Sequence, residues 1–250
     1  MEFPRNQDIA TLCINTIRTL SIDAVQAASS GHPGAPMALA PLAYVLWNRV
    51  MRFDPADPIW PNRDRFVLSN GHASMLLWSI LHLTGVKAVN PEYEVLGQPS
   101  VSLDDIEHFR QLNSPAAGHP EYRHAPGIEA TTGPLGQGIS MCTGLALGER
   151  MLNARVGDDV IDHHTFTIAG DGDMQEGISG EAGSLAGHLE LGRLIAFYDD
   201  NHISIEGDTA LAFSEDVGKR YEAYGWHVQN LHEDLALDRI EQATRAAMAV

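Results

Sequence analysis

The sequence predicts an α/β fold, a three-layer sandwich in which a mostly parallel sheet carries helices on both faces. Short apolar runs typical of buried strands, such as 165–169 and 194–198, alternate with longer segments whose apolar residues recur every three or four positions. The composition, 44% hydrophobic and 20% charged, is that of a globular protein. A chain of 250 residues can form one large α/β domain or two small ones.

The first part of the chain is expected to be mainly helical. A helix from about Gln7 to Ala28 is predicted by one apolar stripe at three- and four-residue steps, made of Ile9, Leu12, Cys13, Ile17, Leu20 and Ala24. Residues 29–34 end this helix, and Ala35–Pro36 begin a second, largely buried one through Trp47. Residues 65–69 are expected to form a strand, and a helix follows the turn at 70–72.

The middle of the chain contains two segments expected to be loops. Residues 86–102 contain Pro91, Gly97 and Pro99, and residues 114–130 are rich in Pro, Gly and His. Between them a helix is predicted over 102–109, with Ser102 and Asp105 as a weak capping signal.

The rest of the chain alternates helices and strands. The pattern predicts helices at 138–154, 176–188, 214–224 with Ser214 as its cap, and 235–250, and strands at 165–169, 194–198 and 226–230. No internal repeat and no low-complexity segment interrupts this order.

Composition narrows the possible partners and location. The net charge of −17 argues against binding to nucleic acid or to an anionic membrane surface. No apolar stretch approaches the ~20 residues needed to cross a bilayer, and Met1–Asn6 lack the pattern of a signal peptide. Cys13 and Cys142 lie in helical, apolar contexts, which indicates buried thiols rather than disulfides. A cytoplasmic protein is therefore expected.

The triplet Gly170-Asp171-Gly172 is the strongest sign of a binding site. It follows the apolar run 165–169, and Asn201 follows the run 194–198, so both lie at carboxyl ends of predicted strands, where α/β sheets bind ligands. A carboxylate and an amide oxygen there fit magnesium with sites left for phosphate oxygens. Glycines flanking Asp171 allow a bulky anion to approach the backbone. Such triplets also occur in ordinary turns, but the two strands and Asn201 favour the metal site.

Three histidines, His32, His72 and His119, lie in loops directly after glycine. A single loop histidine is more often an exposed surface residue, but three in this setting favour bonds to a polyhydroxylated substrate and to phosphate. The glycine-rich run 133–138 matches neither the P-loop nor the dinucleotide fingerprint. It is either a plain turn or a tight loop against a flat ligand. Carboxylates after the triplet, such as Asp173, are explained by the helix dipole. Among them only Glu176 is a candidate for a functional role.

Seven motifs resemble transketolase, in the order in which that family has them. They are S-G-H-P-G-A-P (30–36), R-D-R-F-V-L-S-N-G-H-A (63–73), F-R-Q-L (109–112), G-H-P-E (118–121), T-T-G-P-L-G-Q-G-I (131–139), G-D-G-D-M-Q-E-G-I-S (170–179) and Y-D-D-N-H-I-S-I-E-G (198–207). They cover nearly the whole chain and separate this family from related thiamine enzymes. The resemblance implies a thiamine diphosphate-binding fold and transfer of a two-carbon ketol group from a ketose phosphate to an aldose phosphate.

The resemblance also implies roles for individual residues. Thiamine diphosphate with Mg²⁺ or Ca²⁺ is the implied cofactor, and the implied metal ligands are Asp171, Asn201 and the carbonyl of Ile203. The implied cofactor-binding residues are His72, Gly133, Pro134, Leu135, Gly172, Glu176 and Asn201. His32, His72 and His119 are the implied catalytic residues, lining the substrate channel. A homodimer or a complementary transketolase subunit is the implied partner.

The chain departs from the family in two ways. It is shorter, so residues 1–250 are expected to be the diphosphate- and metal-binding domain without its last strand, with the pyrimidine-binding and carboxy-terminal domains absent. The segment Lys87–Ser100 is longer than in many relatives and is expected to be a surface excursion. Two alternatives stay open: a non-catalytic cofactor-binding or regulatory subunit, and a metal-dependent hydrolase using Asp171 with His163 and His164. The first is disfavoured by the retained substrate-side histidines, and the second because its histidines precede the strand.

Overall fold

The computed structural model describes residues 6–204, 207–232 and 234–250. Residues 1–5, 205, 206 and 233 lie outside this range. Residues 1–5 include most of the segment that was searched for a signal peptide. The central sheet of the described chain has three parallel strands in the order β1 (Arg65–Leu68), β4 (Thr165–Gly170) and β5 (Leu194–Asp199). All three were predicted from their apolar runs.

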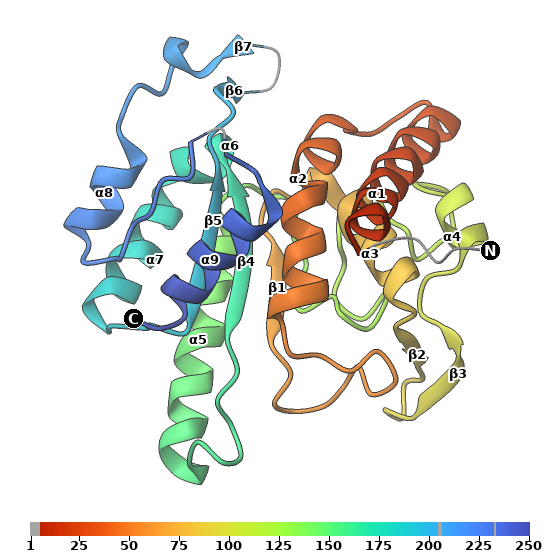
Figure 1. Ribbon diagram of the computed structural model, residues 1–250, viewed down its shortest axis with the longest axis horizontal. Helices are drawn as coiled ribbons and strands as arrows, with labels where there is room; N and C mark the ends of the chain where they lie inside the picture. The colour runs from red at the N-terminus through yellow and green to blue at the C-terminus, as the bar shows by residue number, and fades with distance from the viewer. Residues whose placement is uncertain (1–5, 205–206, 233) are drawn as a thin grey trace.

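Alternate side chains of these strands enter different cores, as expected for a sheet covered on both sides. On one face Phe166 and Ile168 pack with α2 (Gly34–Val45), α3 (Ser74–Thr84) and α9 (Leu237–Ala247). On the other face Val67 packs with α5 (Gln137–Val156) and α7 (Gly177–His188), while Ala169 packs with α8 (Val217–Ala223). Helices therefore cover both faces, and the predicted α/β class is confirmed (Figure 1).

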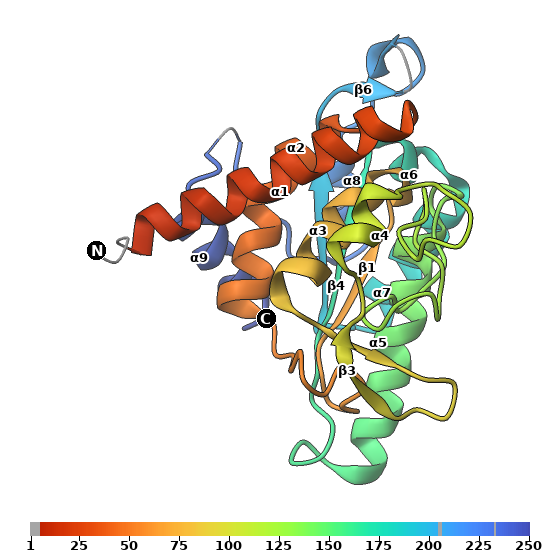
Figure 2. The same cartoon turned by 90° about the vertical axis from the view of Figure 1, so that its right-hand side faces the viewer.

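The first helix, α1 (Asn6–Ala28), lies outside α2 and α3, on the far side of the molecule from α5 (Figure 2). Its predicted stripe was partly wrong. Ile17 and Ala24 are buried as expected, but Ile9 is 40% and Leu12 64% exposed. The buried stripe instead contains the small residues Ala10 and Ser21, together with Ile14, Ile17 and Ala24. Small side chains allow close packing of helices, and a search for large apolar residues overlooks them.

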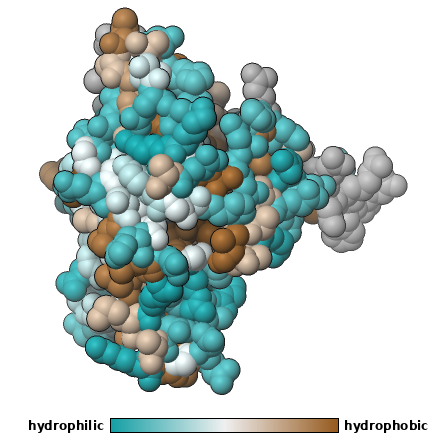
Figure 3. Space-filling model, turned by 90° about the vertical axis from the view of Figure 1, so that its left-hand side faces the viewer, coloured by the Kyte–Doolittle hydropathy of each residue, from teal (hydrophilic) through white to brown (hydrophobic). Residues whose placement is uncertain are grey.

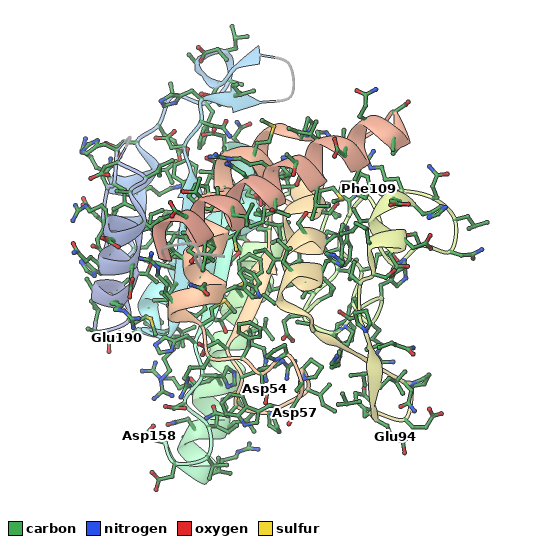
Figure 4. The ribbon with its side chains drawn as sticks, turned by 45° about the vertical axis from the view of Figure 1, so that its right-hand side comes forward. Asp54, Asp57, Glu94, Phe109, Asp158 and Glu190 are labelled. Carbon is green, nitrogen blue, oxygen red and sulfur yellow. The ribbon has the colours of Figure 1, made fainter. Side chains whose placement is uncertain are left out.

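The segment expected to be a loop at 86–102 contains a β-hairpin, so that prediction was wrong. Strands β2 (Lys87–Val89) and β3 (Val95–Pro99) pair antiparallel. The Asn90 side chain closes the turn by accepting a hydrogen bond from the Glu94 backbone N–H at 2.8 Å. Glu94 lies at the tip of the hairpin, far from Phe109 (Figure 4). The next helix, α4 (Leu103–Glu107), is shorter than 102–109, but its Ser102–Asp105 capping box is confirmed.

Two predictions near the carboxyl end were wrong. The cap of α8 is Asp216, which accepts a hydrogen bond from the Lys219 N–H at 3.0 Å, rather than Ser214. Residues 226–230, all of them described, form no strand. Shorter elements complete the described chain: α6 (Asp171–Gln175), a π-helix (Leu46–Val50), 3₁₀ turns (Gly71–Ala73, Thr209–Leu211) and the small hairpin β6 (Ile203–Ser204) and β7 (Gly207–Asp208).

Both cysteines are free thiols in helices, as predicted. Cys142 is fully buried, and this burial raises the pKa of its thiol to about 12, whereas Cys13 is only half-buried. None of the helices in the described part of the chain is both long and apolar enough to span a membrane.

Candidate active site

Three of the predicted site segments meet at the carboxyl edge of the sheet. Gly71-His72 follows β1, Asp171 follows β4, and Asn201 follows β5. Because the strands are parallel neighbours, their ends lie side by side, with α6 and β6 above them (Figure 1). This is the edge at which open α/β sheets bind ligands.

The carboxylate of Asp171 is buried, and one of its oxygens has no hydrogen-bond partner among the described residues. Its residue is 3% exposed, and its Oδ1 accepts a hydrogen bond from the hydroxyl of Tyr198. Its Oδ2 is buried and has no hydrogen-bond partner among the described residues. An unpartnered buried carboxylate oxygen is costly, so a cation at this position would stabilise it.

The two other expected metal ligands are placed differently. Asn201 and Ile203 are exposed, and the Asn201 amide oxygen accepts a hydrogen bond from the Ile203 N–H at 3.0 Å. The amide nitrogen of Asn201 donates to Asp199 at 2.9 Å. An amide oxygen has a second lone pair, so it keeps one for a cation. The described residues contain no group of three or more His, Cys, Asp or Glu arranged around a metal, and the expected set, with one carboxylate, would not form such a group.

Negative charge gathers at this edge. Burial raises the pKa of Asp199, and the carboxylates of Asp171 and Asp200 raise it further. Burial, followed by the hydrogen bond to Asp171, also raises the pKa of Tyr198, so its hydroxyl stays a donor at neutral pH. Carboxylates crowded around one unpartnered oxygen fit a hard divalent cation with oxygen ligands.

The glycine-rich loop packs directly on the turn that carries Asp171. A Cβ on Gly172 would lie 2.7 Å from Leu135, and Gly133, with a φ of +146°, lies against the ring of His119. Two buried oxygen atoms beside this loop, Oδ1 of Asn70 and Oγ1 of Thr132, have no hydrogen-bond partner among the described residues. Side chains larger than hydrogen would fill this cradle, and a polar ligand would satisfy the two oxygens.

Asp173 is a site residue that sequence reasoning missed. It is fully buried, and it accepts hydrogen bonds from the Ser69 hydroxyl at 2.7 Å, the Gly136 N–H at 2.8 Å and the Gly170 N–H at 3.0 Å. The Ser69 hydroxyl oxygen in turn accepts from the Ile139 N–H at 2.9 Å. One carboxylate thus ties together the end of β1, the glycine-rich loop and the turn after β4. The dipole explanation could not reveal this, because it concerns only the residue's own helix.

The three histidines are close enough to influence one another. The rings of His32 and His72 stand edge to face with centroids 5.0 Å apart. Burial is the first cause that lowers the pKa of each of His32, His72 and His119. The positive charge of Arg110 further lowers the pKa of His32 and His119. Three neutral imidazoles at pH 7 can each donate and accept a hydrogen bond.

Arg110 was quoted in a motif but given no role, and the structure shows why it belongs here. It has a φ of +61°, which is uncommon for a side chain of this size, and its guanidinium donates to the Ser30 hydroxyl at 2.7 Å. Ser30 precedes the Gly31-His32 turn, so Arg110 links that turn to the segment after α4. A signal was present in the sequence, since Arg110 lies between two of the histidines, but its partner could not be read from spacing.

Glu176 and Pro134 lie at the rim. Glu176 is exposed at the amino end of α7. A Cβ added to Gly136 would lie 2.7 Å from the Cβ of Glu176. Pro134 is exposed in the loop. The structure thus brings Glu176 to the glycine-rich loop, but no described hydrogen bond of its side chain indicates a function.

The hydrolase interpretation is not supported. His163 and His164 precede β4 and Asp171 follows it, so the length of the strand, roughly 20 Å at ~3.3 Å per residue, separates them. His163 is 5% exposed, and its burial, with help from Arg65, Arg63 and Arg52, lowers its pKa to about 4. At that other end of the sheet, His164 Nδ1 lies 3.9 Å from a carboxylate oxygen of the buried Asp64.

Comparison with known proteins identifies relatives of this arrangement. The family model described as "Transketolase, thiamine diphosphate binding domain" matches residues 9–250. A transketolase of Halalkalibacterium halodurans is 53% identical over 247 residues, which are 98% of this chain and 35% of that protein. A transketolase of Geobacillus stearothermophilus is 53% identical over 244 residues, 96% of this chain and 35% of that protein.

Solved structures agree with the sequence comparison. A transketolase variant from Pichia stipitis superposes with a TM-score of 0.88 at 48% identity, covering 96% of this chain and 34% of that one. Transketolase from Campylobacter jejuni superposes with a TM-score of 0.85 at 44% identity, covering 98% and 36%. The chain therefore spans about a third of the length of the relatives it matches.

Proposed function

The chain belongs to the transketolase family, and we propose that it supplies the diphosphate- and metal-binding half of a transketolase active site. The proposed reaction is reversible transfer of a two-carbon ketol group from a ketose phosphate, such as xylulose 5-phosphate, to an aldose phosphate, such as ribose 5-phosphate. One observation carries the proposal most strongly. A buried carboxylate with an unpartnered oxygen, at Asp171, lies beside a glycine cradle at the carboxyl edge of the sheet.

The residues present fit thiamine diphosphate and a divalent cation, Mg²⁺ or Ca²⁺. Asp171, Asn201 and the Ile203 carbonyl are the proposed metal ligands. The proposed cofactor contacts are His72, Gly133, Pro134, Leu135, Gly172, Glu176 and Asn201. The unpartnered oxygens of Asn70 and Thr132 support a polar ligand beside the loop. An acidic chain, with a net charge of −17, needs a cation to hold a diphosphate.

When bound, thiamine diphosphate supplies a nucleophilic carbon and an electron sink for cleavage of a carbon–carbon bond. The proposed work of His32, His72 and His119 is to bind the sugar hydroxyls and to accept or return protons, which neutral imidazoles do well near pH 7. Burial, followed by the charge of Arg110, lowers the pKa of His32 and of His119 and so favours their neutral form. The bond from Arg110 to Ser30 also fixes the turn that carries His32.

The proposed domain organisation is a diphosphate-binding domain that lacks its last strand, with the pyrimidine-binding and carboxy-terminal domains supplied elsewhere. A cavity of about 390 Å³ supports it, lined by β5, the end of α7, residues 225–227 and Val250. This face of the molecule has a recess edged by apolar residues (Figure 3). The outer edge of β5 is unpaired within the described chain, so a further strand could pair there.

The rest of the proposal concerns setting. A homodimer or a complementary transketolase subunit would complete the site, in the cytoplasm and within pentose phosphate metabolism. The family relationship supports this setting, and the chain spans about a third of the length of its relatives.

The test combines the 250-residue chain with the remaining transketolase domains. Turnover of xylulose 5-phosphate and ribose 5-phosphate should require thiamine diphosphate and Mg²⁺, and the chain alone should show none. Asp171→Ala should abolish metal-dependent cofactor binding in calorimetric titration, while the exposed control Asp57→Ala (labelled in Figure 4) should bind normally. Cofactor binding without turnover in the combined protein would instead favour a non-catalytic subunit.

A further inference from the structure

Tyr198 is the residue that determines how Asp171 is held. In the sheet, Tyr198 of β5 lies opposite Ala169 of β4, two positions before Asp171. Its hydroxyl crosses from β5 to donate a hydrogen bond to Oδ1 of Asp171, and lies 3.3 Å from Oδ1 of Asp200. The phenol therefore stands between two carboxylates from neighbouring strand ends.

This hydrogen bond makes the two oxygens of Asp171 unequal. Oδ1 is occupied by a donor from the protein, while Oδ2 is buried and unpartnered among the described residues. A tyrosine hydroxyl, with an ordinary pKa of about 10, keeps its proton at neutral pH and so acts as the donor. A carboxylate oxygen has a second lone pair, but a cation shared by both oxygens of Asp171 would have to lie beside the phenol proton already bound to Oδ1. The hydrogen bond therefore favours coordination through Oδ2 alone.

The number of carboxylate oxygens that coordinate the cation distinguishes Mg²⁺ from Ca²⁺. Mg²⁺ requires near-ideal octahedral geometry, which a carboxylate meets through a single oxygen, whereas Ca²⁺ accepts six to eight ligands and often a bidentate carboxylate. We propose that Tyr198 is a specificity-determining residue, which favours Mg²⁺ over Ca²⁺ by restricting Asp171 to one coordinating oxygen. This inference rests on the proposed metal site.

The competing explanation is that the hydroxyl only satisfies a buried acceptor and stabilises the fold. That role would weaken both cations equally, because it changes the stability of the turn rather than the number of oxygens that Asp171 offers. The two explanations therefore differ in the ratio of the affinities for Mg²⁺ and Ca²⁺.

The experiment uses Tyr198→Phe in the chain combined with the remaining transketolase domains. Titration calorimetry measures binding of MgCl₂ and of CaCl₂ at saturating thiamine diphosphate, and thermal unfolding without ligands measures stability. Loss of a partner that orients a metal ligand costs roughly 10–100-fold in metal affinity. Mg²⁺ affinity should fall at least about tenfold, and Ca²⁺ affinity should fall much less or rise. Tyr224→Phe, in which a tyrosine just after α8 loses the same atom, should leave both affinities unchanged.

Two results would overturn the inference alone. One is an unchanged Mg²⁺ affinity in Tyr198→Phe, and the other is an equal loss for both cations. If the wild-type protein binds thiamine diphosphate with no dependence on divalent cations, the proposed function fails as well. The wild-type titration therefore separates the two failures.

Discussion

Replacing the buried Asp173 with Asn should lower the free energy of unfolding, because its carboxylate accepts three hydrogen bonds. The carboxylate Oδ1 accepts two hydrogen bonds and Oδ2 accepts one, from the Gly170 N–H. If the amide oxygen of Asn keeps the two bonds, its NH₂ group must face the Gly170 N–H, so two donors oppose each other. The loss of one charge-assisted bond costs about 2 kcal/mol and the unpaired donor about 1 kcal/mol more.

The expected loss is therefore about 3 kcal/mol, which for a chain of this size corresponds to a fall in the unfolding midpoint of about 6–12 °C. Differential scanning calorimetry measures it, with Asp57→Asn as the control because Asp57 is exposed. The double variant with Ser69→Ala should lose less than the sum of the single variants, since the bond from Ser69 is charge-assisted only while residue 173 is a carboxylate. A midpoint within about 2 °C of wild type, no more than an ordinary surface change gives, would refute the assignment of Asp173 as the tie between the three segments.

Two further predictions concern the histidines. The pKa of His163 is about 4 in the folded protein and about 6.5 in the unfolded chain. Between these values the unfolded chain binds a proton and the folded protein does not. The free energy of unfolding should therefore fall by up to about 3 kcal/mol between pH 7 and pH 4. Urea unfolding should show this fall reduced in His163→Gln, and an unchanged pH dependence would contradict the argument. His32→Ala and His119→Ala, in the combined protein, should lower kcat or raise KM for the ketose donor with nearly normal thiamine diphosphate affinity by calorimetry. A collapse of that affinity would mean that these histidines act on the cofactor.

The sequence predicted the three core strands because buried parallel strands have an unambiguous apolar signal, as at 165–169 and 194–198. It was misled at 226–230, where the residues suit a strand but no neighbouring strand of the described chain pairs with them. It also missed the hairpin at 87–99, because Pro91 and Gly97 are typical of loops while the turn depends on hydrogen bonds of the Asn90 side chain. Strand formation depends on pairing, which composition alone does not report.

For the site, the motifs predicted which residues gather at the sheet edge but not how they are connected. Asp171 was predicted from its flanking glycines, whereas its bond to Tyr198 joins residues on different strands. Arg110 and Asp173 were missed for the same reason, since each acts through partners distant in the sequence. Local sequence patterns indicate which residues can bind a ligand. The residues that hold them in place are brought near only by the tertiary fold.

The pairing of β1 with β4 has a consequence for how the protein folds. The bond between Ser69 and Asp173 joins residues 104 positions apart, and closing a loop of that length costs about 4 kcal/mol of chain entropy. Contacts so distant in sequence form slowly. The turn with Asp171, the glycine-rich loop and the end of β1 should therefore take their final positions together, late in folding. Until then the carboxylates at 171 and 173 stay hydrated, and the proposed cation site would be absent from the nascent chain.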